Sequence, residues 1–201
     1  TGVVIIAVGV ALVTWGNKHY AKSATAQRTL KVLKSESASQ YAKNFVWSDT
    51  KKKIDQDELA PFVNNMASSK WSNQRENDIY NQLLSGQAGN GFTFKRTGHA
   101  FLVFPKYQLT VKPVDFNVST NNKDITLKMN GKTIGTSDSD SYSKSYKHQV
   151  SGLYKFNATG KISGQDVATS DEKEIDSNTN VNLAIDMISF DINSNLSSGD
   201  L

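Results

Sequence analysis

The stretch YQLTVKPVDFNVSTN, residues 107–121, contains the pattern that decides how this chain folds. Its apolar residues fall on odd positions at Leu109 and Val111, and on even positions from Val114 onward. Because strand side chains point to opposite faces with a period of two, a slip of one residue turns the apolar set to the other face. The slip falls at Pro113, which cannot donate a ladder hydrogen bond. The pattern predicts two consecutive strands that face different cores.

A second copy of this stretch, VNLAIDMISFDINSN, occupies residues 181–195 and aligns with the first without a gap. Its apolar residues match those of the first copy, and the slip recurs with Met187 in the place of Pro113. Two amphipathic strands can share alternation by chance, but a shared slip favours a true repeat. We therefore expect the chain to leave one β body as its last strand and to enter the next as its first. Residues 188–201 are then the start of a second, truncated β repeat.

Length and composition limit the class of protein. A chain of 201 residues is expected to form one or two domains, and a hydrophobic content of 37% is low for one compact body of this size. The absence of cysteine excludes disulfides, thiol nucleophiles and cysteine-based zinc sites within this sequence. It favours an intracellular protein or a bacterial surface protein that is stable without disulfides.

The first fifteen residues, TGVVIIAVGVALVTW, contain no charge. As a helix this run spans about 22 Å, less than the roughly 30 Å of a bilayer core. It could be the core of a signal peptide, although a basic segment rather than a cleavage site follows it, or a buried helix of a soluble domain. The start on Thr1 and the aromatic cluster of Trp15, His19 and Tyr20 favour the C-terminal part of a transmembrane helix. We expect residues 1–19 to be this part.

Residues 20–104 are predicted to form a small helical, membrane-proximal domain. Apolar residues recur at helical spacing between Ala26 and Val46, and Asp55 with Glu58 forms a potential capping box. A further helix is expected to begin near Ser72. The basic residues of this domain are either a solvated face or a contact with anionic lipid or anionic wall polymer. The candidate contact residues are Lys43, Lys51, Lys52 and Lys53.

Residues 105–187 are predicted to form a β-sandwich repeat. Apolar residues alternate along this region, and Asn130-Gly131 indicates a tight hairpin turn. About seven short strands separated by turns are typical of a small sandwich. The polar stretches 137–145 and 170–180 are expected to be loops. The fold class is therefore α+β in separate domains, with a membrane-span remnant, a small helical domain and a small all-β sandwich.

No pattern of catalytic or ligand-binding residues stands out. The three histidines are scattered, and the acidic residues between 170 and 180 lack the spacing of a calcium loop. Asp57 and Glu58 are neighbours on a helix and do not face each other. We expect no enzyme, no cofactor, no metal site and no nucleic-acid partner.

Four short motifs resemble those of known families. The segment GHAFLVFPKY, residues 98–107, the segment VKPV, residues 111–114, and the hairpin NGKTIG, residues 130–135, occur in an order that resembles the TcaA family of teicoplanin-resistance-associated membrane proteins of Gram-positive bacteria. The hairpin and SGLYKF, residues 151–156, also resemble PEGA-type surface β domains. The resemblance implies a cytoplasmic zinc ribbon before the span, further extracellular domains and a part in the response to glycopeptide antibiotics. It carries over no catalytic residue.

These observations predict a single-pass protein of the bacterial cell membrane with the bulk of the chain extracellular. Its expected role is a non-enzymatic interaction with wall polymers or envelope proteins. One alternative is a carbohydrate-binding or adhesive surface module, for which Tyr142, Tyr146 and Tyr154 are the candidate ligand-facing aromatics. Another is a spacer for a catalytic domain beyond Leu201.

Overall fold

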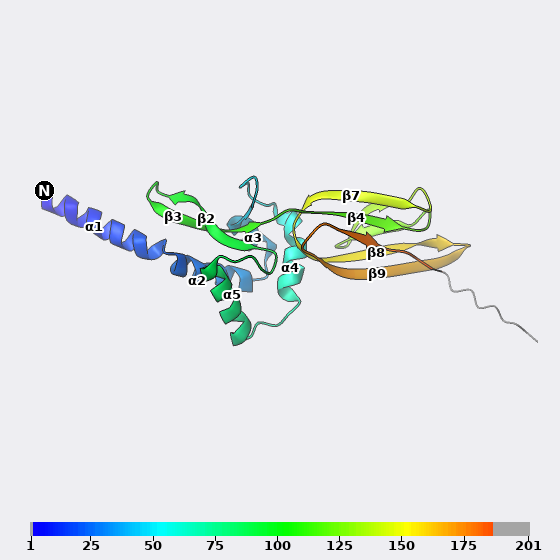
Figure 1. Ribbon diagram of the computed structural model, residues 1–201, viewed down its shortest axis with the longest axis horizontal. Coiled ribbons are helices and arrows are strands. Elements are labelled where there is room, and N and C mark those ends of the chain that lie inside the picture. Colours follow the sequence, from blue (N-terminus) through cyan, green and yellow to red (C-terminus); the bar gives the residue numbers. More distant parts are fainter. Residues whose placement is uncertain (1, 187–201) are drawn as a thin grey trace, which may run out of the picture.

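The computed structural model describes the backbone of residues 2–186 and the side chains of residues 11–186. It contains both helices and β-sheets, which confirms an α+β protein in this coarse sense. The described chain is elongated, with an N-terminal helix at one end and paired sheets at the other (Figure 1). The expected start of a second repeat at residues 188–201 lies outside the described residues.

The helices gather in the N-terminal part of the chain. They are α1 (Gly2–His19), α2 (Lys22–Lys34), α3 (Ala38–Asn44), the 3-10 helix η1 (Gln56–Leu59), α4 (Ala60–Ala67) and α5 (Asn73–Ser85). The predicted capping box is confirmed. The backbone N–H of Asp55 donates to the Glu58 carboxylate, 3.1 Å away, and the Asp55 side chain accepts from the backbone N–H of Glu58. Ser72 caps α5, and Gly86 ends it in a left-handed conformation.

A three-stranded sheet packs with these helices. Its strands are β1 (Phe45–Trp47), β2 (Thr93–Ala100) and β3 (Phe104–Val111), in the order β1-β3-β2. The region predicted as a helical domain thus contains a sheet as well as helices. The expectation for Phe45 and Val46 was wrong, because they lie in a strand rather than on a helix.

The first body, which comprises α2 to β3, has a core rich in aromatic rings. The rings of Tyr41, Phe45 and Phe62 pack together, with centroids 4.7–5.3 Å apart, and all three residues are fully buried. Leu109 and Val111 of β3 are buried in the same core. The boundary that we placed at residue 105 was therefore too early, since β3 belongs to the first body as far as Val111.

The second body is formed by two sheets that enclose one core. Its strands are β4 (Val114–Thr120), β5 (Thr126–Met129), β6 (Lys132–Thr136), β7 (Tyr142–Gln149), β8 (Gly152–Ile162), β9 (Gln165–Ile175) and β10 (Thr179–Asn182). The sheet orders are β10-β4-β7 and β6-β5-β8-β9. Asn130 and Gly131 both have positive φ between β5 and β6, as the predicted tight turn requires.

The two polar stretches predicted as loops are partly strands. β7 begins inside the stretch 137–145, and β9 extends through the acidic residues to Ile175. Polar residues can form these strands because β7 pairs with β4, and β9 with β8, through backbone hydrogen bonds, while their exposed side chains face solvent. Lys155 of β8, for example, forms an ion pair of 3.2 Å with Glu172 of β9.

The slip at Pro113 marks the passage from one core to the other. Val114, Phe116 and Val118 of β4 are buried in the core of the second body, whereas the apolar residues of β3 are buried in the first. The two copies of the repeated stretch also share a role up to the slip. β3 pairs in parallel with β1 of its own body, and β10 pairs in parallel with β4 of its own.

The two bodies are joined by a buried junction. Val150, from the connection between β7 and β8, is 1% exposed and lies in the core of the first body. Gly152 lies against α4 so closely that an added Cβ would be 2.4 Å from the Pro61 carbonyl oxygen. The side-chain amide of Asn64 donates to the Leu153 carbonyl, 3.2 Å away. The chain thus connects its two bodies by packed contacts as well as by the β3–β4 strand.

Within residues 2–186, no helix combines the length and the apolar content expected of a membrane span. α1 has 18 residues, and its exposed apolar side chains near the C-terminal end include Leu12, Val13 and Trp15.

Candidate functional site

The candidate lysines lie on two elements of the first body. Lys43 is exposed on α3, and Lys51, Lys52 and Lys53 are exposed in the tight connection that follows β1. The backbone of this connection folds back on the strand, since the Trp47 N–H donates to the Lys52 carbonyl at 2.9 Å. Among the described residues, none of the four lysines forms an ion pair with a carboxylate. Lys51 Nζ donates to the Ser48 carbonyl oxygen, so its charge is not paired but its ammonium group has a partner within the chain.

The connection that carries these lysines lies at the junction rather than beside α1. Asp49 forms a 3.0 Å contact with Nε2 of His148, which belongs to the second body, and the ring of Trp47 lies 4.3 Å from the same imidazole. The N–H of Thr50 and then His148 hold the pKa of Asp49 below its usual value. α1 leaves the first body at its other end (Figure 1). The three consecutive lysines thus follow residues that contact the second body, at the end of the first body away from α1 (Figure 1).

The three candidate tyrosines do not form an exposed aromatic surface. Tyr154 is 1% exposed in the core of the second body, where its hydroxyl donates to the Val150 carbonyl at 2.5 Å. The suggestion that it faces a ligand was wrong. Its position is explained by the period of two, which places Tyr154 on the same face as the buried Phe156.

Tyr142 and Tyr146 are half-buried against the same core. The Tyr146 ring stacks on Phe116 at 5.6 Å, and its hydroxyl donates to the Ile134 carbonyl at 3.4 Å. Burial, followed by the neighbouring Tyr142, raises the pKa of Tyr146 to about 12. These two rings therefore close one side of the core and leave little ring surface for a sugar to stack on.

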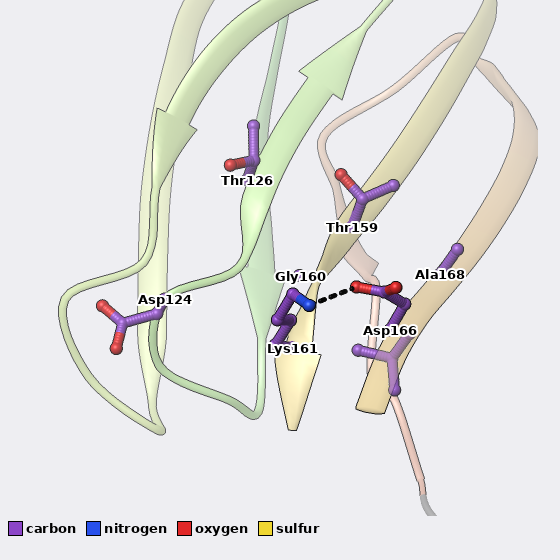
Figure 2. A pocket seen from close by; sticks show the side chains of 8 residues that line it. Asp124, Thr126, Thr159, Gly160, Lys161, Asp166 and Ala168 are labelled. Atoms are coloured by element: carbon purple, nitrogen blue, oxygen red, sulfur yellow. Dashed lines mark ion pairs between the residues drawn. The ribbon is translucent and has the colours of Figure 1, made fainter. Parts of the chain in front are cut away.

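A polar depression of about 750 Å³ lies at the end of the second body where β5, β8 and β9 meet. Figure 2 shows its lining, which includes the hydroxyls of Thr126 and Thr159 on neighbouring strands. Lys161 forms a 3.2 Å ion pair with Asp166 across the β8–β9 ladder. Asp124 points away from this pair (Figure 2).

The chemistry of this depression is limited. A ligand site usually brings a few polar groups together on one point within an apolar wall. Here the lysine is already neutralised by its cross-strand partner, and the eight residues that line the depression include no histidine, cysteine or aromatic ring. We find no pair of groups in it that could activate a nucleophile or place a sugar ring.

The histidines also have structural surroundings. His19 stacks on Trp15 at 4.7 Å, and Nε2 of His99 lies beside the Arg96 guanidinium. The backbone N–H of His148 donates to Asp115 at 2.9 Å. Among the described residues no group of histidines and carboxylates is arranged to hold a metal ion.

One exposed feature was missed by sequence reasoning. Phe101, Leu102 and Val103 form the tip of the β2–β3 hairpin and are 78%, 92% and 67% exposed. We had placed this run within the helical, membrane-proximal domain of residues 20–104. The available signal was its length, because three consecutive apolar residues in an antiparallel hairpin cannot all face a core.

No family model matches the chain, and no curated protein or solved structure matches it. The likeness to the TcaA family rests on the short motifs of the sequence alone.

Proposed function

We propose that this chain is a non-enzymatic, membrane-anchored, extracytoplasmic protein of the bacterial cell envelope. α1 is the C-terminal part of a single transmembrane helix, and the two bodies form a stiff stalk on the outer side. The stalk contacts anionic wall polymer or another envelope protein. Its wider role is in the response to glycopeptide antibiotics, as the resemblance to the TcaA family implies.

The observation that carries this proposal is the arrangement of the parts. The charge-free N-terminal run belongs to a helix that projects from one end of the first body, and the second body lies at the opposite end (Figure 1). Leu12 and Val13 are exposed, and the transfer of their side chains from water into lipid is favourable. Trp15 and Tyr20 lie where an interfacial aromatic belt is expected.

A stalk must resist bending where its parts meet. A flexible joint between bodies needs a glycine- and serine-rich linker, whereas Lys112 and Pro113 alone separate β3 from β4. The buried Val150 and the close contact of Gly152 on Pro61 support a fixed angle between the bodies. The Ig-like, PEGA-like identity of the second body and the continuation of the stalk into a second repeat are part of the same proposal.

Fractionation of the full-length protein in its host tests the anchor. The protein should stay with the membranes in high salt and at alkaline pH, and detergent should release it. Release by high salt alone would contradict a spanning helix, because salt screens exposed charges but does not extract a buried apolar segment.

A second experiment tests the anionic partner. Changing Lys51, Lys52 and Lys53 to glutamine should weaken binding to purified teichoic-acid-type wall polymer, with the largest loss at low salt. The matched control removes three exposed lysines elsewhere, at Lys31, Lys70 and Lys123. Equal losses of binding in the two variants would show that net charge alone explains the binding, not a site at these three lysines. Binding that does not depend on salt would contradict an electrostatic contact.

A further inference from the structure

The tip of the β2–β3 hairpin exposes three large apolar side chains in a row. Leu102 is 92% exposed, more than the other large apolar residues found exposed in the described chain. Single exposed apolar residues are common on protein surfaces, but a contiguous exposed run marks a contact with something outside. These residues are called the apolar tip below: Phe101, Leu102 and Val103.

The backbone of the apolar tip makes its sequence more unusual still. The Val103 N–H donates to the Ala100 carbonyl at 3.3 Å, and the two central residues of this turn, Phe101 and Leu102, have φ of 48° and 65°. Such turns favour asparagine and glycine, and bulky residues are rare in them. The β5–β6 hairpin of the same chain has positive φ at Asn130-Gly131. The apolar tip therefore combines a strained backbone with exposed apolar side chains.

The apolar tip lies beside α1. The hairpin points along α1 toward its N-terminal end (Figure 1). The ring of Phe104 rests on the helix backbone at Gly16, where an added Cβ would be 2.0 Å from the ring. The Tyr20 ring stacks on Phe104 at 5.2 Å and meets the edge of Phe101 at 6.2 Å. Helix and hairpin thus form one surface in which Trp15, Tyr20 and the tip are neighbours.

Charge at this end of the molecule has one sign. The hairpin from Thr93 to Val111 carries Lys95, Arg96 and Lys106 and no acidic residue. The sequence from residue 1 to residue 35 also contains no aspartate or glutamate. An apolar tip surrounded by basic groups matches a bilayer, whose apolar interior lies beneath anionic headgroups.

We propose that the apolar tip inserts into the headgroup–acyl boundary of an anionic bilayer, as a second membrane contact beside α1. This inference rests on the proposed anchoring of α1. The insertion buries the three apolar side chains and leaves the basic groups of β2 and β3 among the headgroups. Two contacts also fix the rotation of the first body about the axis of α1, so that the stalk leaves the membrane in one direction.

Fluorescence quenching at single sites tests the insertion. The chain has no cysteine, so Leu102→Cys or Ser163→Cys gives one labelling site for an environment-sensitive fluorophore. Ser163 is the matched control because it is exposed and has φ of 51° at the far β8–β9 turn. The labelled full chain is reconstituted into phosphatidylglycerol vesicles that contain brominated acyl chains, and flotation is measured on the same samples.

The expected result is flotation of both proteins, with quenching at Leu102→Cys several-fold greater than at Ser163→Cys. Flotation with equal, weak quenching at both sites would overturn the insertion and leave the anchor intact. Failure of both proteins to float would overturn the anchor and the insertion together. Vesicles of neutral phosphatidylcholine should reduce quenching at Leu102→Cys, and no reduction would contradict the role of the basic groups.

A second variant tests the position of the hairpin. Gly16→Val should push the Phe104 ring off α1 and lower the quenching at Leu102→Cys, while flotation stays unchanged. Asn17→Ala, at the exposed neighbouring position, is the control and should leave quenching as it is. Unchanged quenching in Gly16→Val would show that α1 does not hold the tip at the membrane.

Discussion

The two ends of the first body treat apolar residues in opposite ways. At the end toward the second body, Phe62 is fully buried and Val150 reaches into the core from the neighbouring body. At the end toward α1, the apolar tip is exposed on a strained turn. At the first end, residues of the second body cover the apolar core. At the second end, no described residue covers the apolar tip. The difference separates a structural contact from one directed outward.

The same substitution at the two ends should have very different effects. Phe62→Ala removes a ring packed between Phe45, 4.7 Å away, and Tyr41, and should lower the free energy of unfolding by about 3–5 kcal/mol. Phe101→Ala removes a ring that is 78% exposed and should change it by less than about 0.5 kcal/mol in water. Urea denaturation of both variants in the absence of lipid measures the contrast. Similar losses would mean that the tip is part of the core.

The junction itself should be sensitive to a single methyl group. Gly152→Ala places a Cβ against the backbone of Pro61, which cannot rotate away as a side chain can, and should cost about 1–3 kcal/mol. Gly98→Ala is the matched control, since an added Cβ there meets no atom within 4 Å. Denaturation gives the stability, and small-angle scattering gives the angle between the bodies. A change in Gly98→Ala as large as that in Gly152→Ala would contradict a steric cause.

Local rules predicted the parts of the fold in which neighbouring residues decide the structure. Asp55 and Glu58 cap η1 as their spacing indicates, and Asn130-Gly131 forms the expected turn. The slip at Pro113 located the change of core, because the period of two is strict wherever one face of a strand is buried.

The sequence was least informative where tertiary contacts decide. Val150 stands in a polar context next to a β8 strand of the second body, yet it is buried in the first, and no local pattern indicates a contact between bodies. Phe45 fits helical spacing as well as strand spacing. It lies in a strand because it pairs with Leu109 of β3. The alternation along β8 already predicted that Tyr154 is buried with Phe156, which excludes it as a ligand-facing aromatic.

A variant with an unstrained β2–β3 turn should show that the apolar tip does not stabilise the fold in water. Replacing Phe101 with asparagine and Leu102 with glycine gives the β2–β3 turn the residues that the β5–β6 turn already has. The double variant should be more stable in water by about 1 kcal/mol, because positive φ is then unstrained and no large apolar side chain is exposed. The reverse exchange at Asn130 and Gly131 should destabilise. A double variant that is less stable than the parent would mean that the tip packs within the chain.

The smallest effect is expected from acid at the junction, where two carboxylates, one from each body, hold His148. Nε2 of His148 lies 3.0 Å from Asp49, and its backbone N–H donates to Asp115 at 2.9 Å. The pKa of Asp49 is lowered by the Thr50 N–H and then by His148, and that of Asp115 by the His148 N–H and then by Lys147.

A lowered pKa in the fold fixes the sign of the pH dependence. Each carboxylate stabilises the fold above its unfolded pKa of about 4, and this stabilisation is lost as the pH falls through the lower folded value. Asp49→Asn should therefore lower the urea midpoint slightly at neutral pH, and the difference from the parent should vanish toward about pH 2. Asp138→Asn, in the exposed β6–β7 connection, removes the same charge and serves as the control. If the two variants follow the same curve, net charge explains the effect, and the contact with His148 adds nothing to the junction.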